Sequence, residues 1–281
     1  MNNGWMTLVH VCRRWRNVVF GSPCRLNLQL VCSDKTPVRS SLGIWPPLPT
    51  VITQHFYPAR DMDNILAALE HVDRISRIIL YYVPSAQMEK VRSAMQGPFP
   101  ALTHLQLFWP KRSLDATNII FGGPAPHLRV LTLDGIAIQG LPKLLLSATD
   151  LVALDLIRIP HSEYISPEAM VIGLSRLPRL KFLFLGFKSP QSHPDQEKRH
   201  LPPLTRTVLP ALTSFLFRGV SEYLEDLFSR IDTPQLVQLS ITFFHQLIFD
   251  TPQLAQFLSR TLMLKSEKVT CFNLNPNSPY L

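Results

Sequence analysis

The sequence predicts an α/β fold of repeated strand–helix units, and three observations lead to this prediction. A leucine pattern recurs along the chain at intervals typical of repeat proteins. Segments with helical periodicity fall between the copies of this pattern, so that strands and helices alternate. Hydrophobic residues make up 46% of the 281 residues, which is enough for an extended core.

The recurring pattern has the form L-x-x-L-x-L, in which the last two apolar residues lie on one face of a short strand. One copy is PHLRVLTL, with leucines at positions 128, 131 and 133. Five further stretches match it, namely PALTHLQL, TDLVALDL, PRLKFLFL, PALTSFLF and PQLVQLSI, and two weaker ones are DRISRIIL and KVTCFNL. The first apolar positions fall at residues 75, 102, 128, 151, 180, 212, 236 and 269, so the intervals range from 23 to 33 residues.

These intervals predict a leucine-rich-repeat horseshoe, a solenoid of about seven to eight irregular repeats, because the period of such repeats is roughly 20–29 residues. Each repeat would pack on its neighbours, with strands on the concave face and helices on the convex face. Positions that hold Asn in many leucine-rich repeats hold Ile136, Ile159, Val220 and Phe244 here, so the curvature is not fixed by the sequence. The alternative is a Leu-rich α/β domain that matches the pattern by chance.

Helices are predicted in the segments between the strands. Residues 85–95 place Met88, Val91 and Met95 on one helical face. Residues 166–174 begin with Ser-Pro-Glu, a capping residue followed by proline in the first turn. Residues 222–231 and 251–264 repeat the theme, and the second again opens with a cap residue and a proline.

The amino-terminal segment predicts an amphipathic helix. One face carries Leu8, Val11, Cys12, Trp15 and Val18 or Val19, and the opposite face carries Arg13, Arg14 and Arg16. The sequence Gly21-Ser22-Pro23 then ends the helix. Such a helix needs a partner surface for its apolar face.

The same residues carry a resemblance to a known family. The stretch LVHVCRRWR, residues 8–16, followed by Ser22-Pro23, looks like the carboxy-terminal half of an F-box. It continues with Thr36-Pro37-Val38-Arg39, Leu42, Trp45-Pro46, Leu48-Pro49 and Val51-Ile52. By these motifs, residues 5–52 resemble the F-box leucine-rich-repeat proteins of mushroom-forming fungi, with an amino-terminally truncated F-box.

The resemblance implies a protein-binding substrate receptor of a cullin-RING (SCF-type) ubiquitin ligase, with no catalysis in this chain. In that family the F-box docks on a Skp-type adaptor and the repeats hold an unknown protein substrate; the resemblance assigns adaptor binding to Leu8, Val11, Cys12 and Trp15. The first half of the family's F-box has no counterpart in residues 1–4. The alternative is therefore a leucine-rich-repeat scaffold without ligase attachment, in which the helix only caps the repeats.

The expected organisation is a partial F-box-like helical segment at 1–30, a connecting segment at 31–70 and a leucine-rich-repeat domain at 71–281. Positions between the leucines of each strand point out of the concave face. This alternation gives the candidate partner-binding residues Arg77, Tyr81, His104, Phe108, Phe182, Phe184, Leu216 and Arg218. Aromatic residues and arginine dominate the energetics of protein interfaces. The alternative is that the insertion at 188–206 folds back over Phe182 and Phe184.

Other classes of function are not predicted. The net charge is +8, but Lys and Arg are dispersed along the chain, so we expect no nucleic-acid partner. The sequence has no hydrolase, zinc-protease or phosphate-loop motif, and we expect no enzyme and no cofactor. The four cysteines form no C-x-x-C pair, so we expect reduced thiols and no metal site. No run of about 18 apolar residues and no signal segment occurs, so we expect an intracellular protein, cytoplasmic or nuclear, without a membrane partner.

Overall fold

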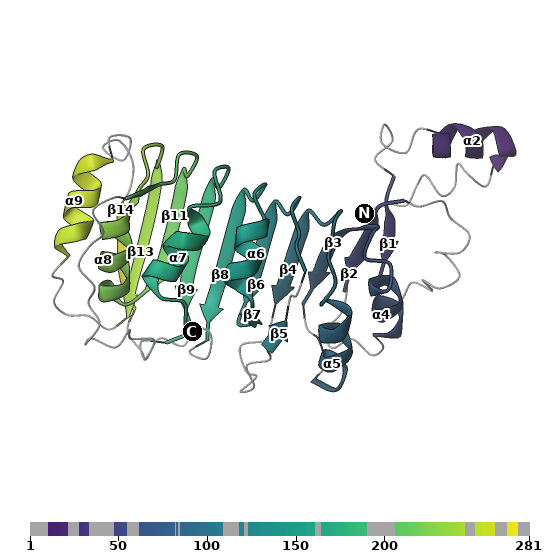
Figure 1. Ribbon diagram of the computed structural model, residues 1–281, viewed down its shortest axis with the longest axis horizontal. Coiled ribbons are helices and arrows are strands. Elements are labelled where there is room, and N and C mark those ends of the chain that lie inside the picture. Colours follow the sequence, from purple (N-terminus) through teal and green to yellow (C-terminus); the bar gives the residue numbers. More distant parts are fainter. Residues whose placement is uncertain are drawn as a thin grey trace.

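The computed structural model describes residues 11–21, 28–33, 48–54, 62–81, 83, 85–108, 118–120, 123–160, 164–189, 206–244, 251–261 and 269–274. These residues form an α/β structure around one ten-stranded sheet, in the order β1-β2-β3-β4-β6-β8-β9-β11-β13-β14 (Figure 1). Every neighbouring pair in this sheet is parallel. The sheet is open, because β1 and β14 form its two ends.

The strands of the sheet are β1 (Leu30–Cys32), β2 (Thr50–Thr53), β3 (Ile75–Leu80), β4 (His104–Phe108), β6 (Val130–Asp134), β8 (Ala153–Ile159), β9 (Phe182–Phe187), β11 (Ser214–Gly219), β13 (Gln238–Phe244) and β14 (Val269–Leu274). Two short parallel pairs lie apart from it, β5 (Asn118–Ile120) with β7 (Ala137–Gln139) and β10 (Thr207–Val208) with β12 (Ile231–Asp232).

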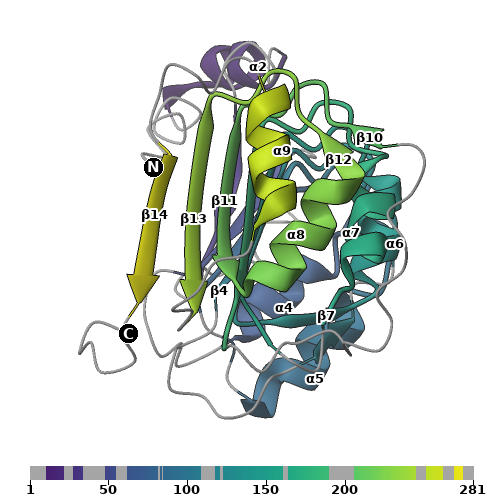
Figure 2. The same ribbon diagram turned by 90° about the vertical axis from the view of Figure 1, so that its left-hand side faces the viewer.

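The helices are α2 (Arg13–Gly21), α4 (Asp63–Leu69), α5 (Ser85–Ala94), α6 (Leu141–Ser147), α7 (Pro167–Leu174), α8 (Ser221–Arg230) and α9 (Pro252–Arg260). Helices α4 to α9 all lie along one face of the sheet (Figure 2). We call the opposite face the outer face. From β3 to β13 it consists of Arg77, Ile79, His104, Gln106, Phe108, Val130, Thr132, Asp134, Ala153, Asp155, Ile157, Phe182, Phe184, Gly186, Ser214, Leu216, Arg218, Gln238, Ser240 and Thr242.

The prediction of a leucine-rich-repeat horseshoe is wrong, and so is the description of the chain as a solenoid: the structure is an α/β fold on one continuous parallel sheet. The leucine pattern does not distinguish the two, because any strand packed on helices by one face needs buried residues at alternate positions. The connections are also unlike one another. Among their described residues, the link from β4 to β6 holds a short strand and the link from β11 to β13 holds a helix. The varying intervals therefore reflect different connections rather than one repeated unit.

The predicted orientation of the leucines is confirmed, and the predicted alternation of strands and helices is confirmed except from β4 to β6 and from β9 to β11, where the described residues hold no helix. In the six copies that begin with leucine, the last two apolar residues point to the helices, as Leu131 and Leu133 do, and the first leucine lies just before its strand. Those first leucines are all buried, at positions 102, 128, 151, 180, 212 and 236. One cluster of buried apolar side chains runs from Leu30 to Phe257. The core is therefore a single layer between the sheet and its helices.

Thr132 is a correction to the expected core. It alternates with the leucines and was expected to lie outside the buried region, yet only 4% of its surface is exposed. Its hydroxyl accepts a hydrogen bond of 3.3 Å from Nε2 of Gln106 on the neighbouring strand. The outer face is thus closely packed at its centre even where no described helix covers it.

Leu131→Ala and Leu183→Ala should each lower the free energy of unfolding by about 2–5 kcal/mol, because each truncation leaves a cavity in the core. Both leucines are fully buried. The matched controls are Arg129→Ala and Lys181→Ala, which change exposed positions two residues earlier. Urea unfolding of the four variants measures the difference, and equal losses at 129 and 131 would contradict the assigned strand orientation.

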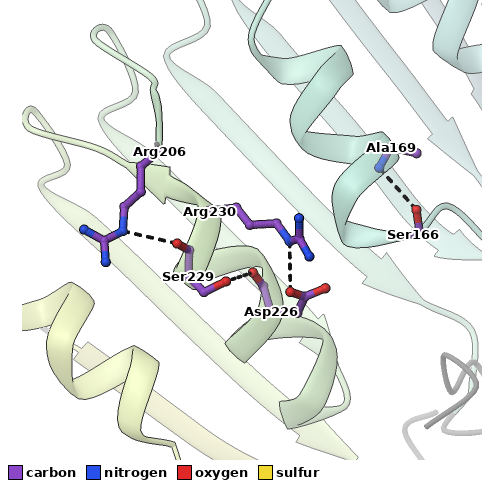
Figure 3. A network of polar contacts seen from close by, with 6 residues as sticks. All are labelled: Ser166, Ala169, Arg206, Asp226, Ser229 and Arg230. Atoms are coloured by element: carbon purple, nitrogen blue, oxygen red, sulfur yellow. Dashed lines mark hydrogen bonds and ion pairs between the residues drawn. The ribbon is translucent and has the colours of Figure 1, made fainter. Parts of the chain in front are cut away.

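The helix ends have two kinds of cap. As predicted, Ser166 caps α7, and its hydroxyl accepts a 3.2 Å hydrogen bond from the Ala169 N–H (Figure 3). Thr251 was predicted to cap α9 but makes no such bond with its side chain. The carboxylate of Glu225 on α8 does so instead, accepting from the N–H groups of Gln253 at 2.7 Å and Leu254 at 2.9 Å. One helix thus caps the next.

Polar contacts also hold the last turn of α8 (Figure 3). Arg230, although only 7% exposed, donates from Nε to Asp226 at 2.9 Å. The Ser229 hydroxyl donates to the Asp226 carbonyl at 2.7 Å, and Nε of Arg206 donates to the Ser229 carbonyl at 3.1 Å. The bond from Arg206 satisfies a carbonyl group that the end of the helix leaves without a backbone partner, and the two bonds to Asp226 tie side chains of the last turn to the turn before it.

Glu225→Ala should lower the free energy of unfolding by about 1–2 kcal/mol, because it removes a cap and a negative charge at the start of α9. Gln256→Ala, an exposed change on α9 itself, is the control. Thermal unfolding compares the two variants. An unchanged melting temperature for Glu225→Ala would show that the cap contributes nothing to stability.

Candidate functional site

Parallel pairing brings the predicted partner-binding residues into two groups on or beside the outer face. The first group lies on β3 and β4 and contains Arg77, Tyr81, His104 and Phe108. The second lies on β9 and β11 and contains Phe182, Phe184, Leu216 and Arg218. Strands β6 and β8 separate the groups, which places them about 14 Å apart at the usual strand spacing. The sequence therefore placed these residues on one face but did not show that they form two patches.

The first group is centred on an aromatic stack. The rings of Tyr81 and Phe108 lie 5.0 Å apart between centroids and 13° from parallel. Tyr81 follows the end of β3 and is 52% exposed, whereas Phe108 is half-buried. Stacked rings hold a flat apolar area at the surface with little conformational freedom, which suits a contact site.

His104 lies in the same group, beside Arg77 in the strand pairing. Its Nδ1 lies 2.9 Å from the Thr103 hydroxyl. Burial, and then the positive charges of Arg77 and Arg129, lower the pKa of His104. The imidazole is therefore neutral at physiological pH, and the cationic character of this group comes from the arginines.

The second group is mainly apolar. Phe184 lies beside Leu216 in the strand pairing, and Gly186 lies beside Arg218. A Cβ atom at Gly186 would come within 3.0 Å of the Phe184 ring, so the absence of a side chain at 186 leaves room for that ring. The guanidinium carbon of Arg218 lies 5.5 Å from the centroid of the Phe244 ring, a cation–π contact. Phe244, assigned from sequence only to a turn, is thus part of this group.

Two charged side chains of the outer face lack a hydrogen-bond or ion-pair partner among the described residues. Nε of Arg218 is buried and makes no hydrogen bond, and burial lowers the pKa of this guanidinium. Asp155, beside Phe184 on the neighbouring strand, is half-buried, and burial raises the pKa of its carboxyl. By contrast, Asp134 on the same face is paired with Nε of Arg158 at 2.5 Å. Unpaired charges in a half-buried position destabilise the free protein and are available to a partner.

The predicted adaptor-binding residues begin outside the described part of the chain, where Leu8 lies. Val11 and Cys12 precede α2 and are exposed, and Trp15 lies on the helix. Val11, Trp15 and Val18 are 63%, 48% and 58% exposed, so an apolar stripe of the predicted helix face is uncovered. Val19, on another side of the helix, packs with Leu28 and Leu48 near the first strands.

A cavity of about 370 Å³ lies between the sheet and the starts of α6 and α7. Its lining is largely aliphatic, including Leu133 and Leu156, and Ser166 at its edge already caps α7. Tyr164 also lines the cavity; burial, and then the charge of Asp226, raise its pKa to about 12, so it stays protonated at physiological pH. Within the described residues, no cluster of His, Cys, Asp or Glu could hold a metal ion. The lining offers apolar contact rather than acid–base chemistry.

One alternative from the sequence falls outside the described part of the chain. The insertion expected to fold back over Phe182 and Phe184 spans residues 188–206, of which the structure describes only 188, 189 and 206. The two phenylalanines themselves are half-buried. Part of each ring is therefore accessible to a partner or to another segment of the chain.

Asp155→Asn should raise the free energy of unfolding at neutral pH. Burial holds the folded-state pKa of Asp155 above its ordinary 3.8, so the folded state favours the protonated carboxyl, and this contribution is lost as pH rises above 3.8. The stabilisation by Asn should therefore disappear below pH 3.8. Urea unfolding at both pH values measures it, with the exposed change Asp73→Asn as control. A loss of stability in Asp155→Asn at neutral pH would show that this carboxylate has a favourable partner.

Comparisons of the chain with protein-family models, with curated proteins and with solved structures found no match. Among the described residues, no helix has both the length and the apolar composition needed to cross a bilayer.

Proposed function

We propose that this protein is the substrate receptor of a cullin-RING ubiquitin ligase, which holds a protein substrate on the outer face of its sheet. In this proposal the amino-terminal segment around α2 docks on a Skp-type adaptor, and the chain itself performs no catalytic step. The single observation that carries the proposal is the combination of two surfaces that no described helix covers, the apolar stripe of Val11, Trp15 and Val18 and the aromatic patches of the outer face. A receptor needs two such surfaces, one for each partner.

The stripe on α2 supports the adaptor contact. Val11, Trp15 and Val18 recur at helical spacing and are all exposed. Arginines at 13, 14 and 16 flank the stripe, and α2 has no acidic residue in its first turn. Exposed tryptophan beside arginine is typical of interface anchors. The resemblance of residues 5–52 to an F-box gives this surface its proposed partner.

The outer face supports the substrate contact. The seven strands from β3 to β13 at the usual spacing give a surface about 29 Å wide, on which an extended segment of another chain can lie. Its rows of side chains alternate with the buried leucines, so they are held rigidly from below. Rigid aromatic side chains lose little conformational entropy when they bind.

A second candidate is a scaffold that binds a partner on the outer face but has no ligase attachment. The packing of Val19 against Leu28 and Leu48 favours it, because this contact ties α2 to the residues that lead into β1 and β2. Covering an exposed core at the end of a sheet is a sufficient structural role for such a helix.

Trp15→Ala should weaken adaptor binding by roughly 30-fold, because a tryptophan anchor commonly contributes about 2 kcal/mol or more to binding. The measurement is a titration of the purified chain with purified Skp-type adaptor. Asn17→Ala, which changes an exposed residue on the same helix, is the matched control. Both variants should keep the melting temperature of the unchanged protein, since both side chains are exposed.

Absence of adaptor binding by the unchanged chain, together with a stable fold, would contradict ligase attachment and support the scaffold. Equal weakening by Trp15→Ala and Asn17→Ala would contradict the assignment of the stripe as the adaptor surface.

A further inference from the structure

We propose that Arg218 is the anchor for a carboxylate of the bound partner, and that the partner is an extended polypeptide segment carrying an apolar residue and an acidic residue two positions apart. This inference deepens the proposed function of the outer face and rests on it. It specifies which chemistry the second group recognises.

The first step is the unpaired state of Arg218. Its Nε is buried without a hydrogen-bond partner, and its paired neighbours on the adjacent strands are Gly186 and Thr242, which carry no charge. Asp134, Asp226 and Asp232 are each paired with another arginine. The side chain as a whole is only half-buried, so a partner can supply the acceptor that this guanidinium lacks among the described residues.

The second step is the shape of the group around the guanidinium. The Phe244 ring centroid lies 5.5 Å from the guanidinium carbon, a cation–π contact that takes up none of the guanidinium's hydrogen-bond donors. A guanidinium presents its donors as a planar fork that matches the two oxygens of a carboxylate. An acidic side chain or a terminal carboxylate fits this fork better than a neutral amide does.

The third step is the spacing of the apolar contacts. Leu216 lies two residues before Arg218 on the same face of β11, and Phe184 lies beside Leu216 on β9. Residues two apart on a strand are separated by about 7 Å, and an extended partner has the same repeat. A partner segment along β11 therefore places an apolar residue on Leu216 and Phe184 when its acid, two positions away, reaches Arg218.

Asp155 sets the direction of the segment. Asp155 lies beside Phe184 on the next strand, so it is level with the apolar contact and not with Arg218. It has no hydrogen-bond or ion-pair partner among the described residues. A partner carboxylate at that end of the group would meet a like charge, which is destabilising. The acid of the segment must therefore lie toward Arg218, and a lysine or arginine of the partner is favoured near Asp155.

The experiment is a display selection of randomised extended peptides against the full chain. We expect enrichment of Asp or Glu two positions from Leu, Ile or Phe. The most enriched peptide is then synthesised with a fluorophore, together with versions in which its acid is replaced by the amide or its apolar residue by Ala. Binding by fluorescence anisotropy should fall about 10–30-fold for the amide version.

Arg218→Gln should weaken the acidic peptide to the same extent and leave the amide version unchanged, so that the two changes are not additive. The matched control is Arg176→Gln, an exposed arginine just after α7, which should bind like the unchanged protein. The melting temperature of Arg218→Gln should stay the same or rise, because the change removes a half-buried charge that has no counterion among the described residues.

The outcomes separate this inference from the proposed function. The enriched peptides could instead need Phe184 for binding but neither an acid of their own nor Arg218. This result would overturn Arg218 as the carboxylate anchor and would leave the outer face as a binding surface. The absence of any peptide that discriminates the unchanged protein from Phe184→Ala would overturn both. A third outcome is that Arg218→Gln lowers the melting temperature and that Asp195→Asn or Glu197→Gln lowers it equally. This result would show that an acid of the chain's own insertion binds Arg218, and it would overturn the inference.

Discussion

The structure depends on one constraint: a parallel sheet whose described helices all pack on the same face (Figure 2). Each strand must then divide its side chains into a row that enters the core and a row that does not. The core row is filled by leucine, isoleucine and phenylalanine, and its members are almost fully buried. The other row is freed from core packing, so its residues can serve recognition. Polar side chains at the strand starts link neighbouring strands. The Thr103 hydroxyl, for example, donates a 2.8 Å hydrogen bond to the Ser76 carbonyl on the strand before it.

The outer row contains groups that a purely structural face would not need. Arg218 and Asp155 are half-buried without counterions among the described residues, and burial disfavours the charged form of each. A protein keeps such residues at a cost in stability when they act in binding. The aromatic stack of Tyr81 and Phe108 adds an exposed apolar area to the same face. Together these features favour a face that is complete only when a partner covers it.

The strands around Leu105, Leu131 and Leu183 could be predicted because alternating burial is a local property of the sequence. The horseshoe could not be distinguished from an open parallel sheet, because both require that alternation. Strands β1 and β2 escaped prediction, since LVC and TVIT are short and lack the leucine pattern. The cap from Glu225 and the contact of Arg218 with Phe244 depend on how separate elements lie side by side. Candidate residues could thus be placed on a face, but their pairing required the structure.

The most direct test of the outer face as the binding surface is hydroxyl-radical footprinting of the full chain, with and without the tightest selected peptide. We expect Phe184 and Leu216 to lose reactivity on binding. Leu146 on α6 and Ile172 on α7, which are exposed on the helical side, should react equally in both states. Protection of Leu146 or Ile172 with unchanged reactivity of Phe184 and Leu216 would show that the partner binds the helices and not the outer face.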